Sequence, residues 1–299
     1  MVMSKTFAVV GGDLRYAHLA NLLALREEGY RVYGMFLEKE AMLCAHVIPS
    51  MDVKLVLPQS DVVIFPLPLL ESRGFINTPL SEKRITLEEC LDYISPDAVV
   101  LAGKVSGESL GQARRRGIEL IDYLEREEFA VLNAVPTAEG AVQIALEEMP
   151  TTLFGSTCVI TGFGRISKVL ARLLVAFGAK VKVMARKCSD LAWIRLYGCE
   201  AVPASQLSEA LSKADIVFNT VPTILLDEKK LTRLKRECLI IDLASKPGGV
   251  DFETAKQLGV RVIWALSLPG KVAPISAGEI TLDTIFNILN EKELIKSCL

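Results

Sequence analysis

The segment Thr157–Lys187 contains the residues of this chain that most clearly predict a chemical function. An apolar, partly β-branched run, Cys158–Thr161, is followed by the glycine turn Gly162-Phe163-Gly164. Apolar residues then recur at helical spacing, and Val181–Met184 resumes the two-residue period of a strand. Glycines let the backbone of such a turn approach a pyrophosphate lying at the N-terminus of the following helix. The segment therefore predicts a dinucleotide-binding strand-helix-strand unit.

We expect this turn to bind the cofactor through Gly162, Phe163, Gly164, Arg165 and Ile166, with Arg165 supplying a nearby cation. Ser167 stands where the usual fingerprint has a third glycine, so the helix and strand should pack slightly less closely. Two glycines alone are a weak signal, and the alternative is an ordinary turn that binds no nucleotide.

The residues after the second strand bear on which nicotinamide cofactor is used. NAD sites place an acidic side chain here, on the ribose 2′-hydroxyl, whereas NADP sites replace it with a cation. The chain has the sequence Ala185-Arg186-Lys187 at this point. Ala185 cannot repel a 2′-phosphate, and Arg186 can bind one bidentately, with Lys187 adding positive charge. This pattern favours NADP, with NAD as the alternative, unless the two cations are simply solvated.

Composition excludes several classes of function. With 34 basic and 36 acidic residues interspersed, the net charge of -2 indicates no nucleic-acid partner and no anionic membrane surface. The mean hydropathy is +0.35, yet charges, Pro and Gly interrupt the apolar runs before a membrane span, and the N-terminus has no cleavable signal segment. We therefore expect a cytoplasmic protein.

Cysteine and histidine usage argues against metal chemistry. The seven cysteines lack any C-x-x-C pair, which disfavours a disulfide framework and a structural zinc site. His18 and His46 are the only two histidines, too few for a multi-histidine site, so no metal is expected. Residues 47–299 also lack a histidine acid or base, which disfavours a hydroxyacid dehydrogenase with a histidine in its C-terminal half.

The elements that must position these residues alternate between strands and helices, which predicts two mostly parallel α/β sheets. We expect an N-terminal flavodoxin- or Rossmann-like domain over 1–150, a Rossmann NAD(P)-binding domain over 151–276, and a C-terminal helix, 277–299, packing back on the first domain. First-domain strands are expected at Phe7–Val10, Tyr30–Phe36, Asp61–Phe65, Ala98–Ala102 and Phe129–Asn133. Thr137 should cap a helix running through Glu148.

Second-domain strands are expected at Asp215–Asn219, Leu239–Leu243 and Val260–Trp264. Ligands of open parallel sheets bind outside the carboxyl ends of the strands. The residues that follow these strands should therefore add to the cofactor site: Asn219, Thr220, Val221, Pro222, Asp242, Leu243, Ala244, Pro269 and Gly270. The content of proline and glycine in Leu266–Pro274 suggests a shaped loop rather than a helix, with a plain connector as the alternative.

Five ordered motifs together resemble the dipicolinate synthase A-subunit family of spore-forming bacteria. They are Gly11-Gly12-Asp13-x-Arg15, Pro136–Gly140, Gly162–Arg165, Asp242–Asp251 and Leu268–Pro274, and they cover nearly the whole chain. The resemblance implies a dehydrogenase-like subunit that acts with a flavoprotein-like B subunit in the mother cell during sporulation. It implies oxidation of 4-hydroxy-tetrahydrodipicolinate, a small dicarboxylate of the lysine pathway, or of its dehydrated form.

A dianionic substrate needs cations and backbone donors, which we expect in a cleft between the two domains. Arg15 is the first candidate for a carboxylate clamp, unless it is an exposed helix arginine. Asp13 is placed for a polar contact, unless it only caps a helix. Ser106 and Gly107 are expected to hold the second carboxylate together with Lys104. Lys104 is also a candidate catalytic residue, and the equal alternative is that it is simply a solvated surface lysine. Thr137 and Lys271 complete the predicted substrate set.

Glu139 is the candidate for accepting or relaying a proton, although a glutamate in the first turn of a helix is also favoured by capping and the helix dipole. Three other interpretations stay open. The chain could be an NADP-sensing regulator without turnover, a scaffold that shapes its partner's site, or another amino- or hydroxy-acid dehydrogenase. The sequence leaves open whether it forms a homo-oligomer.

Overall fold

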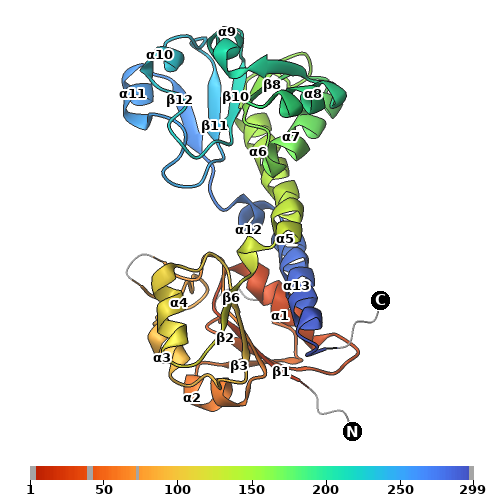
Figure 1. Cartoon of the computed structure of the whole chain (residues 1–299), viewed down its shortest axis with the longest axis vertical. Coiled ribbons are helices and arrows are strands. Elements are labelled where there is room, and N and C mark those ends of the chain that lie inside the picture. Colours follow the sequence, from red (N-terminus) through yellow and green to blue (C-terminus); the bar gives the residue numbers. More distant parts are fainter. Residues whose placement is uncertain (1–4, 39–42, 72–73, 296–299) are drawn as a thin grey trace. The chain divides into compact units, whose positions relative to one another are not determined.

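The computed structural model of the chain describes residues 5–38, 43–71 and 74–295. These divide into two compact units, one formed by Met1–Leu132 with Ala273–Leu299 and the other by Asn133–Val272. Figure 1 shows a sheet with flanking helices in each unit. The chain therefore passes into the second unit after Leu132 rather than near residue 150, and the helix expected at the end of the first domain belongs to the second unit.

The first unit contains a six-stranded parallel sheet with the order β3-β2-β1-β4-β5-β6. Its strands are β1 (Thr6–Val10), β2 (Arg31–Met35), β3 (Val47–Ser50), β4 (Val62–Ile64), β5 (Val99–Ala102) and β6 (Leu120–Asp122). This is the order of dinucleotide-binding folds, in which the chain leaves the central pair, β1 and β4, in opposite directions. The topological switch point of this sheet lies between these two strands.

Helices cover both faces of the first sheet (Figure 1). They are α1 (Leu14–Ala24), α2 (Val53–Val56), α3 (Leu87–Leu91), α4 (Gly107–Arg114), α5 (Glu127–Leu132) and α13 (Pro274–Glu291), with 3-10 turns η1 (Leu57–Gln59) and η2 (Tyr123–Glu125). Alternate strand residues divide between the two cores. Phe7 and Val9 face the core of α1, α5 and α13, whereas Ala8 and Val10 face that of α2, α3 and α4.

The second unit repeats this topology, with a parallel sheet in the order β12-β11-β10-β7-β8-β9. Its strands are β7 (Thr157–Thr161), β8 (Lys180–Ala185), β9 (Glu200–Pro203), β10 (Ile216–Asn219), β11 (Leu239–Asp242) and β12 (Arg261–Trp264). Its helices are α6 (Ala134–Glu148), α7 (Arg165–Ala176), α8 (Cys188–Leu196), α9 (Leu207–Ser212), α10 (Glu228–Leu231), α11 (Phe252–Gln257) and α12 (Leu268–Val272), with the 3-10 turn η3 (Ala204–Gln206). Its switch point lies between β7 and β10.

The predicted α/β class with two parallel sheets is confirmed, and three local predictions are wrong. Phe129–Asn133, expected as a strand, lies in and directly after helix α5. The helix expected to begin at Thr137 begins at Ala134, so Thr137 is inside α6, where its hydroxyl donates to the Asn133 carbonyl at 2.8 Å. Leu268–Val272, expected as a loop, forms the short helix α12. A short apolar run fits a helix or a strand, and packing decides between them.

Helix α13 packs against α1 in the first unit, and glycine allows their close approach. A Cβ atom at Gly278 would lie 2.8 Å from the Arg15 carbonyl oxygen and 3.4 Å from the His18 Cβ. A backbone oxygen cannot rotate away as a flexible side chain can. The position of the first turn of α1 therefore depends on the missing side chain at residue 278.

In the described chain, one helical stretch, Glu127–Glu148, is long and apolar enough to cross a membrane by length and composition. Core helices of soluble proteins meet the same criterion. Within its own unit, α5 packs against α13, and α6 packs against α7 and α12. Both parts of the stretch therefore already bury apolar surface against protein.

We predict that Gly278→Ala destabilises the first unit although alanine is the better helix former. The overpacked methyl group should lower the free energy of unfolding by about 1–2 kcal/mol. Gly111→Ala in α4 is the matched control, because its Cβ would meet only the mobile end of Arg115, at 3.7 Å. That control should gain up to about 1 kcal/mol. Urea denaturation of both variants tests this, and an equal gain in both would contradict the close contact.

Candidate functional site

The glycine turn of the second unit leaves open space in front of helix α7. Gly162 follows β7 with φ +88°, and its Cβ would lie 2.9 Å from the Thr220 Oγ1, so only glycine fits without strain. Gly164 is the N-cap of α7, and it has no side chain that could cap the helix. A Cβ at Gly164 would meet nothing within 4 Å. The first amides of α7 are therefore approached through open space, as a pyrophosphate at a helix N-terminus requires.

Ser167 compensates for the missing third glycine of the fingerprint. It is fully buried in the first turn of α7, and its hydroxyl lies 2.9 Å from that of Thr220. The Thr220 hydroxyl in turn donates to the Thr161 carbonyl at 2.8 Å. A hydrogen-bonded pair of hydroxyl groups thus joins α7 to the ends of β7 and β10, where a glycine would have allowed bare van der Waals contact.

A buried polar network joins the ends of β7, β10 and β11. Asn219 and Asp242 are both fully buried, and the Asn219 amide donates to Asp242 Oδ1 at 2.7 Å. The Thr161 hydroxyl donates to Asn219 Oδ1 at 2.5 Å. The Asp242 carboxylate also accepts from the backbone amides of Ala244 and Gly249, at 3.0 and 2.9 Å. Asp242 could bind a ribose of the cofactor or orient the loop after β11, and these bonds favour orientation of the loop.

The remaining residues predicted to bind the cofactor differ in exposure. Val221, Phe163 and Ile166 are half-buried and Pro222 is exposed, while Leu243 and Ala244 are buried. Phe163 packs edge-on against Tyr197, with ring centroids 5.6 Å apart. Pro269 is buried and Gly270 half-buried in α12, which packs against α6, whereas Lys271 is exposed.

Two exposed cations follow β8, at the place where the sequence predicted a contact with a 2′-phosphate. Ala185 ends the strand with its methyl group in the core, and Arg186 and Lys187 are exposed before α8. Within the described chain neither cation forms an ion pair or a side-chain hydrogen bond. Contact with an adenosine 2′-substituent would therefore fall to Arg186 and Lys187 rather than to Ala185.

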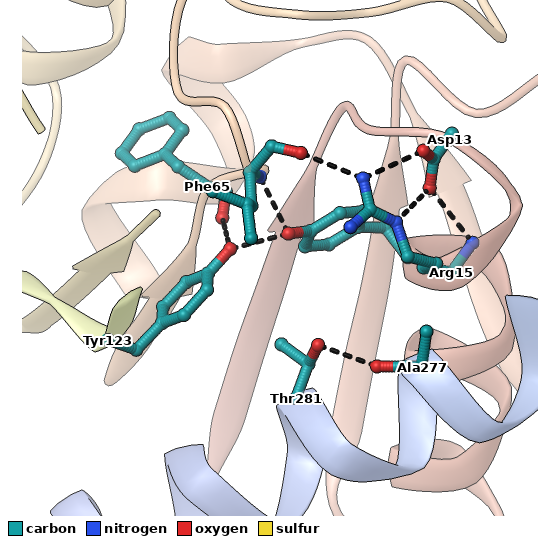
Figure 2. Close-up of polar contacts among 8 residues, drawn as sticks. Asp13, Arg15, Phe65, Tyr123, Ala277 and Thr281 are labelled. Carbon is teal, nitrogen blue, oxygen red and sulfur yellow. Dashed lines mark hydrogen bonds and ion pairs between the residues drawn. The ribbon is translucent and has the colours of Figure 1, made fainter. Parts of the chain in front are cut away.

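In the first unit the corresponding turn, Gly11-Gly12-Asp13, holds an ion pair (Figure 2). Asp13 is the N-cap of α1, and its Oδ1 accepts from the Arg15 amide at 3.1 Å and from Arg15 Nε at 2.8 Å. Arg15 Nη2 donates to Asp13 Oδ2 and to the Leu67 carbonyl, both at 2.8 Å. Burial alone would lower the pKa of the Arg15 guanidinium, but the bonds to Asp13, together with the neighbouring Tyr16 and Tyr123, raise that pKa above its ordinary value. Arg15 is thus a permanent cation.

Two tyrosines that the sequence did not mark as functional hold the loop after β4. The Leu67 amide donates to the Tyr16 hydroxyl at 2.6 Å, and that hydroxyl lies 2.5 Å from the Tyr123 hydroxyl. Tyr123 donates to the Phe65 carbonyl at 3.2 Å, as Figure 2 shows. Burial raises the pKa of Tyr16 to about 12 and that of Tyr123 well above its ordinary value, so both keep their protons. No local motif marks Tyr123, which is 107 residues from Tyr16.

Lys104 follows β5 with φ +61°, a left-handed conformation unusual for a lysine. The Asp122 carboxylate, at the end of β6, holds this turn by accepting from the amides of Lys104 and Val105 at 3.0 and 2.6 Å. The Lys104 side chain is exposed. Ser106 is the N-cap of α4, where it accepts from the Ser109 amide, and Gly107 is the exposed first residue of that helix.

Glu139 lies in the second turn of α6, not the first, because the helix begins earlier than expected. It is exposed, so capping and the helix dipole no longer account for it. Thr137, on the same helix, is half-buried and bonded to the helix backbone. The two candidates from the start of α6 thus belong to the second unit, and Asp13, Arg15 and Lys104 to the first.

Chemically, the second unit offers a glycine cradle with an open helix N-terminus and exposed cations after the next strand. These residues fit a nicotinamide dinucleotide. The first unit offers a buried cation, a partly exposed carboxylate and an exposed lysine at the carboxyl edge of its own sheet.

Comparison with known proteins agrees with this division. Residues 6–124 match the family of N-terminal domains of the dipicolinate synthase A subunit. Residues 133–248 match the family described as D-isomer specific 2-hydroxyacid dehydrogenase, NAD binding domain. The first range lies in the first unit and the second range in the second unit.

The chain is 31% identical over 296 residues to the dipicolinate synthase A subunit of Bacillus subtilis (strain 168), covering 97% of this chain and 98% of that protein. The crystal structure of the dipicolinate synthase A subunit from Bacillus halodurans has a TM-score of 0.88 at 30% identity, covering 97% of this chain and 99% of that one. A transhydrogenase from Sinorhizobium meliloti, with a TM-score of 0.73 at 16% identity and coverage of 96% and 94%, shares the fold.

The NAD-binding domain confirms that a nicotinamide cofactor is used, and with the full-length relative it identifies the chain as an NAD(P)-dependent oxidoreductase. The resemblance drawn from the five sequence motifs is confirmed as well. The chain belongs to the dipicolinate synthase A-subunit family.

Proposed function

We propose that this chain oxidises 4-hydroxy-tetrahydrodipicolinate with loss of one water, or its already dehydrated dihydrodipicolinate form, to dipicolinic acid, with NADP accepting the hydride. The observation that carries the proposal is the match to a dipicolinate synthase A subunit, which is 31% identical over 97% of this chain. When bound, the nicotinamide would accept the hydride released as the ring becomes aromatic. The residues of this chain would bind and orient the substrate and take up a proton.

Substrate binding is assigned to the carboxyl edge of the first sheet, where Asp13 and Arg15 follow β1 and Lys104, Ser106 and Gly107 follow β5. Lys104 supports the assignment through its exposed ammonium group and its left-handed backbone, since strained backbone gathers at functional sites. Thr137 and Lys271 are the candidates of the second unit. Glu139, exposed on α6, is the candidate proton acceptor.

The relative is itself named as one subunit of a synthase, which supports a partner, and we propose that this partner is a flavoprotein-like B subunit. The reaction would take place in the cytoplasm of the mother cell of a sporulating bacterium, as the resemblance to the family of spore-forming bacteria implies.

The first test supplies purified protein with NADP and enzymatically generated 4-hydroxy-tetrahydrodipicolinate, with and without the B subunit. We expect dipicolinate and NADPH to form in equal amounts, and a requirement for the B subunit would make the complex the active unit. Absorbance of both products is followed together. Intact NADPH binding without product in either condition would instead favour the regulatory function considered from the sequence.

For cofactor choice, we expect Arg186→Ser to weaken NADPH binding by about 10- to 100-fold, the worth of a charged hydrogen bond, and to leave NADH binding unchanged. Arg195→Ser, at the far end of α8, removes the same charge from an exposed position and serves as the matched control. Isothermal titration with both nucleotides gives the ratio. Equal losses for NADPH and NADH would show that Arg186 does not contact the 2′-phosphate.

For the pyrophosphate site, we expect Gly164→Val to reduce affinity for both nucleotides by at least about 10-fold with little loss of thermal stability. The reason is that the new side chain enters open space and meets no protein atom. Gly162→Ala is the contrasting variant, which should also lower the melting temperature because its φ is +88° and its Cβ approaches Thr220. Unchanged nucleotide binding in Gly164→Val would show that the cofactor does not bind at this turn.

A further inference from the structure

The two units use the same backbone turn for opposite purposes. The N-cap of α1, Asp13, has φ -88° and ψ -166°, and the N-cap of α7, Gly164, has φ -84° and ψ -166°. The place that is open in front of α7 is therefore occupied, at the equivalent point in front of α1, by the Asp13 carboxylate. A negative charge at this point repels a pyrophosphate and occupies the amide that would bind it. The first unit thus holds a Rossmann-type switch point that is closed to dinucleotides.

In the ion pair at this switch point, the carboxylate is more exposed to solvent than the cation. The Arg15 side chain is 8% exposed and that of Asp13 is 30% exposed. Arg15 joins the two loops that leave the switch point, through Asp13 after β1 and Leu67 after β4. An arriving ligand therefore meets Asp13 first. The guanidinium of Arg15, the first candidate for a carboxylate clamp, already donates to the Asp13 carboxylate and to the Leu67 carbonyl.

The remaining hydrogen-bonding capacity of the pair can be counted. A carboxylate has about four lone-pair sites. Oδ1 of Asp13 accepts two hydrogen bonds and Oδ2 accepts one, which leaves one acceptor site on Oδ2. Arg15 Nη1 makes no hydrogen bond within the described chain, and it is not among the buried atoms without a partner, so it reaches solvent. The pair thus offers one charged acceptor beside one charged donor.

The orientation of this pair is fixed by the surrounding structure. A chain of hydrogen bonds holds the loop whose carbonyl binds Arg15. It runs from the Leu67 amide through the hydroxyls of Tyr16 and Tyr123 to the Phe65 carbonyl. On the other side, α13 lies against the first turn of α1 at Gly278. A polar group held this firmly can discriminate between ligands, because it cannot turn away from a poor partner.

We propose that Asp13 is a specificity-determining residue that accepts a hydrogen bond from the substrate, with Arg15 as the residue that positions it. This rests on the proposed function. The non-aromatic substrate carries a donor, either its hydroxyl or a protonated ring nitrogen. Dipicolinate has two carboxylates and a pyridine nitrogen, all of them acceptors. Asp13 therefore attracts the substrate and repels the product, which favours release of product after oxidation.

The direct test needs no variant. Dipicolinate is compared with 4-hydroxypyridine-2,6-dicarboxylate, which keeps the ring and both carboxylates and adds one donor, an O–H or a ring N–H in its two tautomers. We expect the hydroxylated compound to bind the NADP-loaded protein about 10- to 100-fold more tightly. Equal affinities, measured by titration calorimetry, would overturn the inference.

Asp13→Asn then assigns the effect to this residue. The amide keeps an acceptor for capping α1 and replaces Oδ2 by a nitrogen that only donates. We expect the affinity ratio to fall to about 1 and dipicolinate to become a stronger inhibitor, while NADPH binding stays unchanged. Asp251→Asn, at the N-cap of α11, is the matched control and should keep the original ratio. A ratio that persists in Asp13→Asn would overturn the assignment.

If Asp13 had only a structural role, Asp13→Asn would lower the melting temperature without changing the ratio of the affinities for the two ligands. Binding of neither compound would also overturn the inference, and turnover of substrate in the same preparation then shows whether the proposed function survives. If Asp13→Asn does not fold, the comparison on the unaltered protein still decides.

Discussion

Both units depend on one constraint, which arises where the chain leaves the two central strands of a parallel sheet in opposite directions. The loops that part there expose backbone polar groups that the sheet no longer satisfies, so side chains must join them. In the second unit, Asn219 and Asp242 do this without solvent contact. In the first unit, Arg15 and the two tyrosines perform the same task. The geometry of each candidate site follows from how its switch point is held together.

The same constraint explains why one fold carries two kinds of site. A bare N-cap at Gly164 leaves the amides and the dipole of α7 available to an anion. With Asp13 at the equivalent place in α1, its carboxylate accepts from the Arg15 amide, and the buried Arg15 side chain receives the negative charge that it needs. A buried guanidinium without a partner would be strongly destabilising. The choice of one residue at the N-cap thus decides whether the start of the helix stays open to an anion or is capped by a carboxylate.

The sequence was sufficient for the features that are local. The strand, turn and helix around Gly162 lie within one short segment, and each has its own period, so the cofactor unit was predicted with its boundaries nearly correct. The helix α5 was predicted as a strand because Phe129–Asn133 is too short for a period to decide, and α5 packs against α13, which lies at the opposite end of the chain. The three-residue strand β6 and the edge strands β3 and β9 were missed because they too are too short to show a period.

The site of the first unit was predicted only in part, since Asp13 and Arg15 belong to a motif whereas their supports do not. Tyr16 and Tyr123 meet through the fold, and the Leu67 carbonyl is a backbone group that no residue type announces. These contacts change which group of the ion pair is the more exposed. A motif containing arginine suggests a clamp for carboxylates, but the contacts leave the carboxylate of Asp13 as the more exposed member of the pair.

The lack of histidine after residue 46 fits this arrangement. A hydroxyacid dehydrogenase must remove a proton from an alcohol as hydride leaves, which calls for a neutral base of ordinary strength. Under the proposed function, the proton comes instead from a ring carbon or a ring nitrogen. Loss of this proton creates an aromatic product, so the substrate itself supplies part of the driving force. A carboxylate or water then suffices as acceptor, and what the protein must provide is orientation. The second unit can therefore keep the NAD-binding domain of the hydroxyacid dehydrogenases without keeping a histidine.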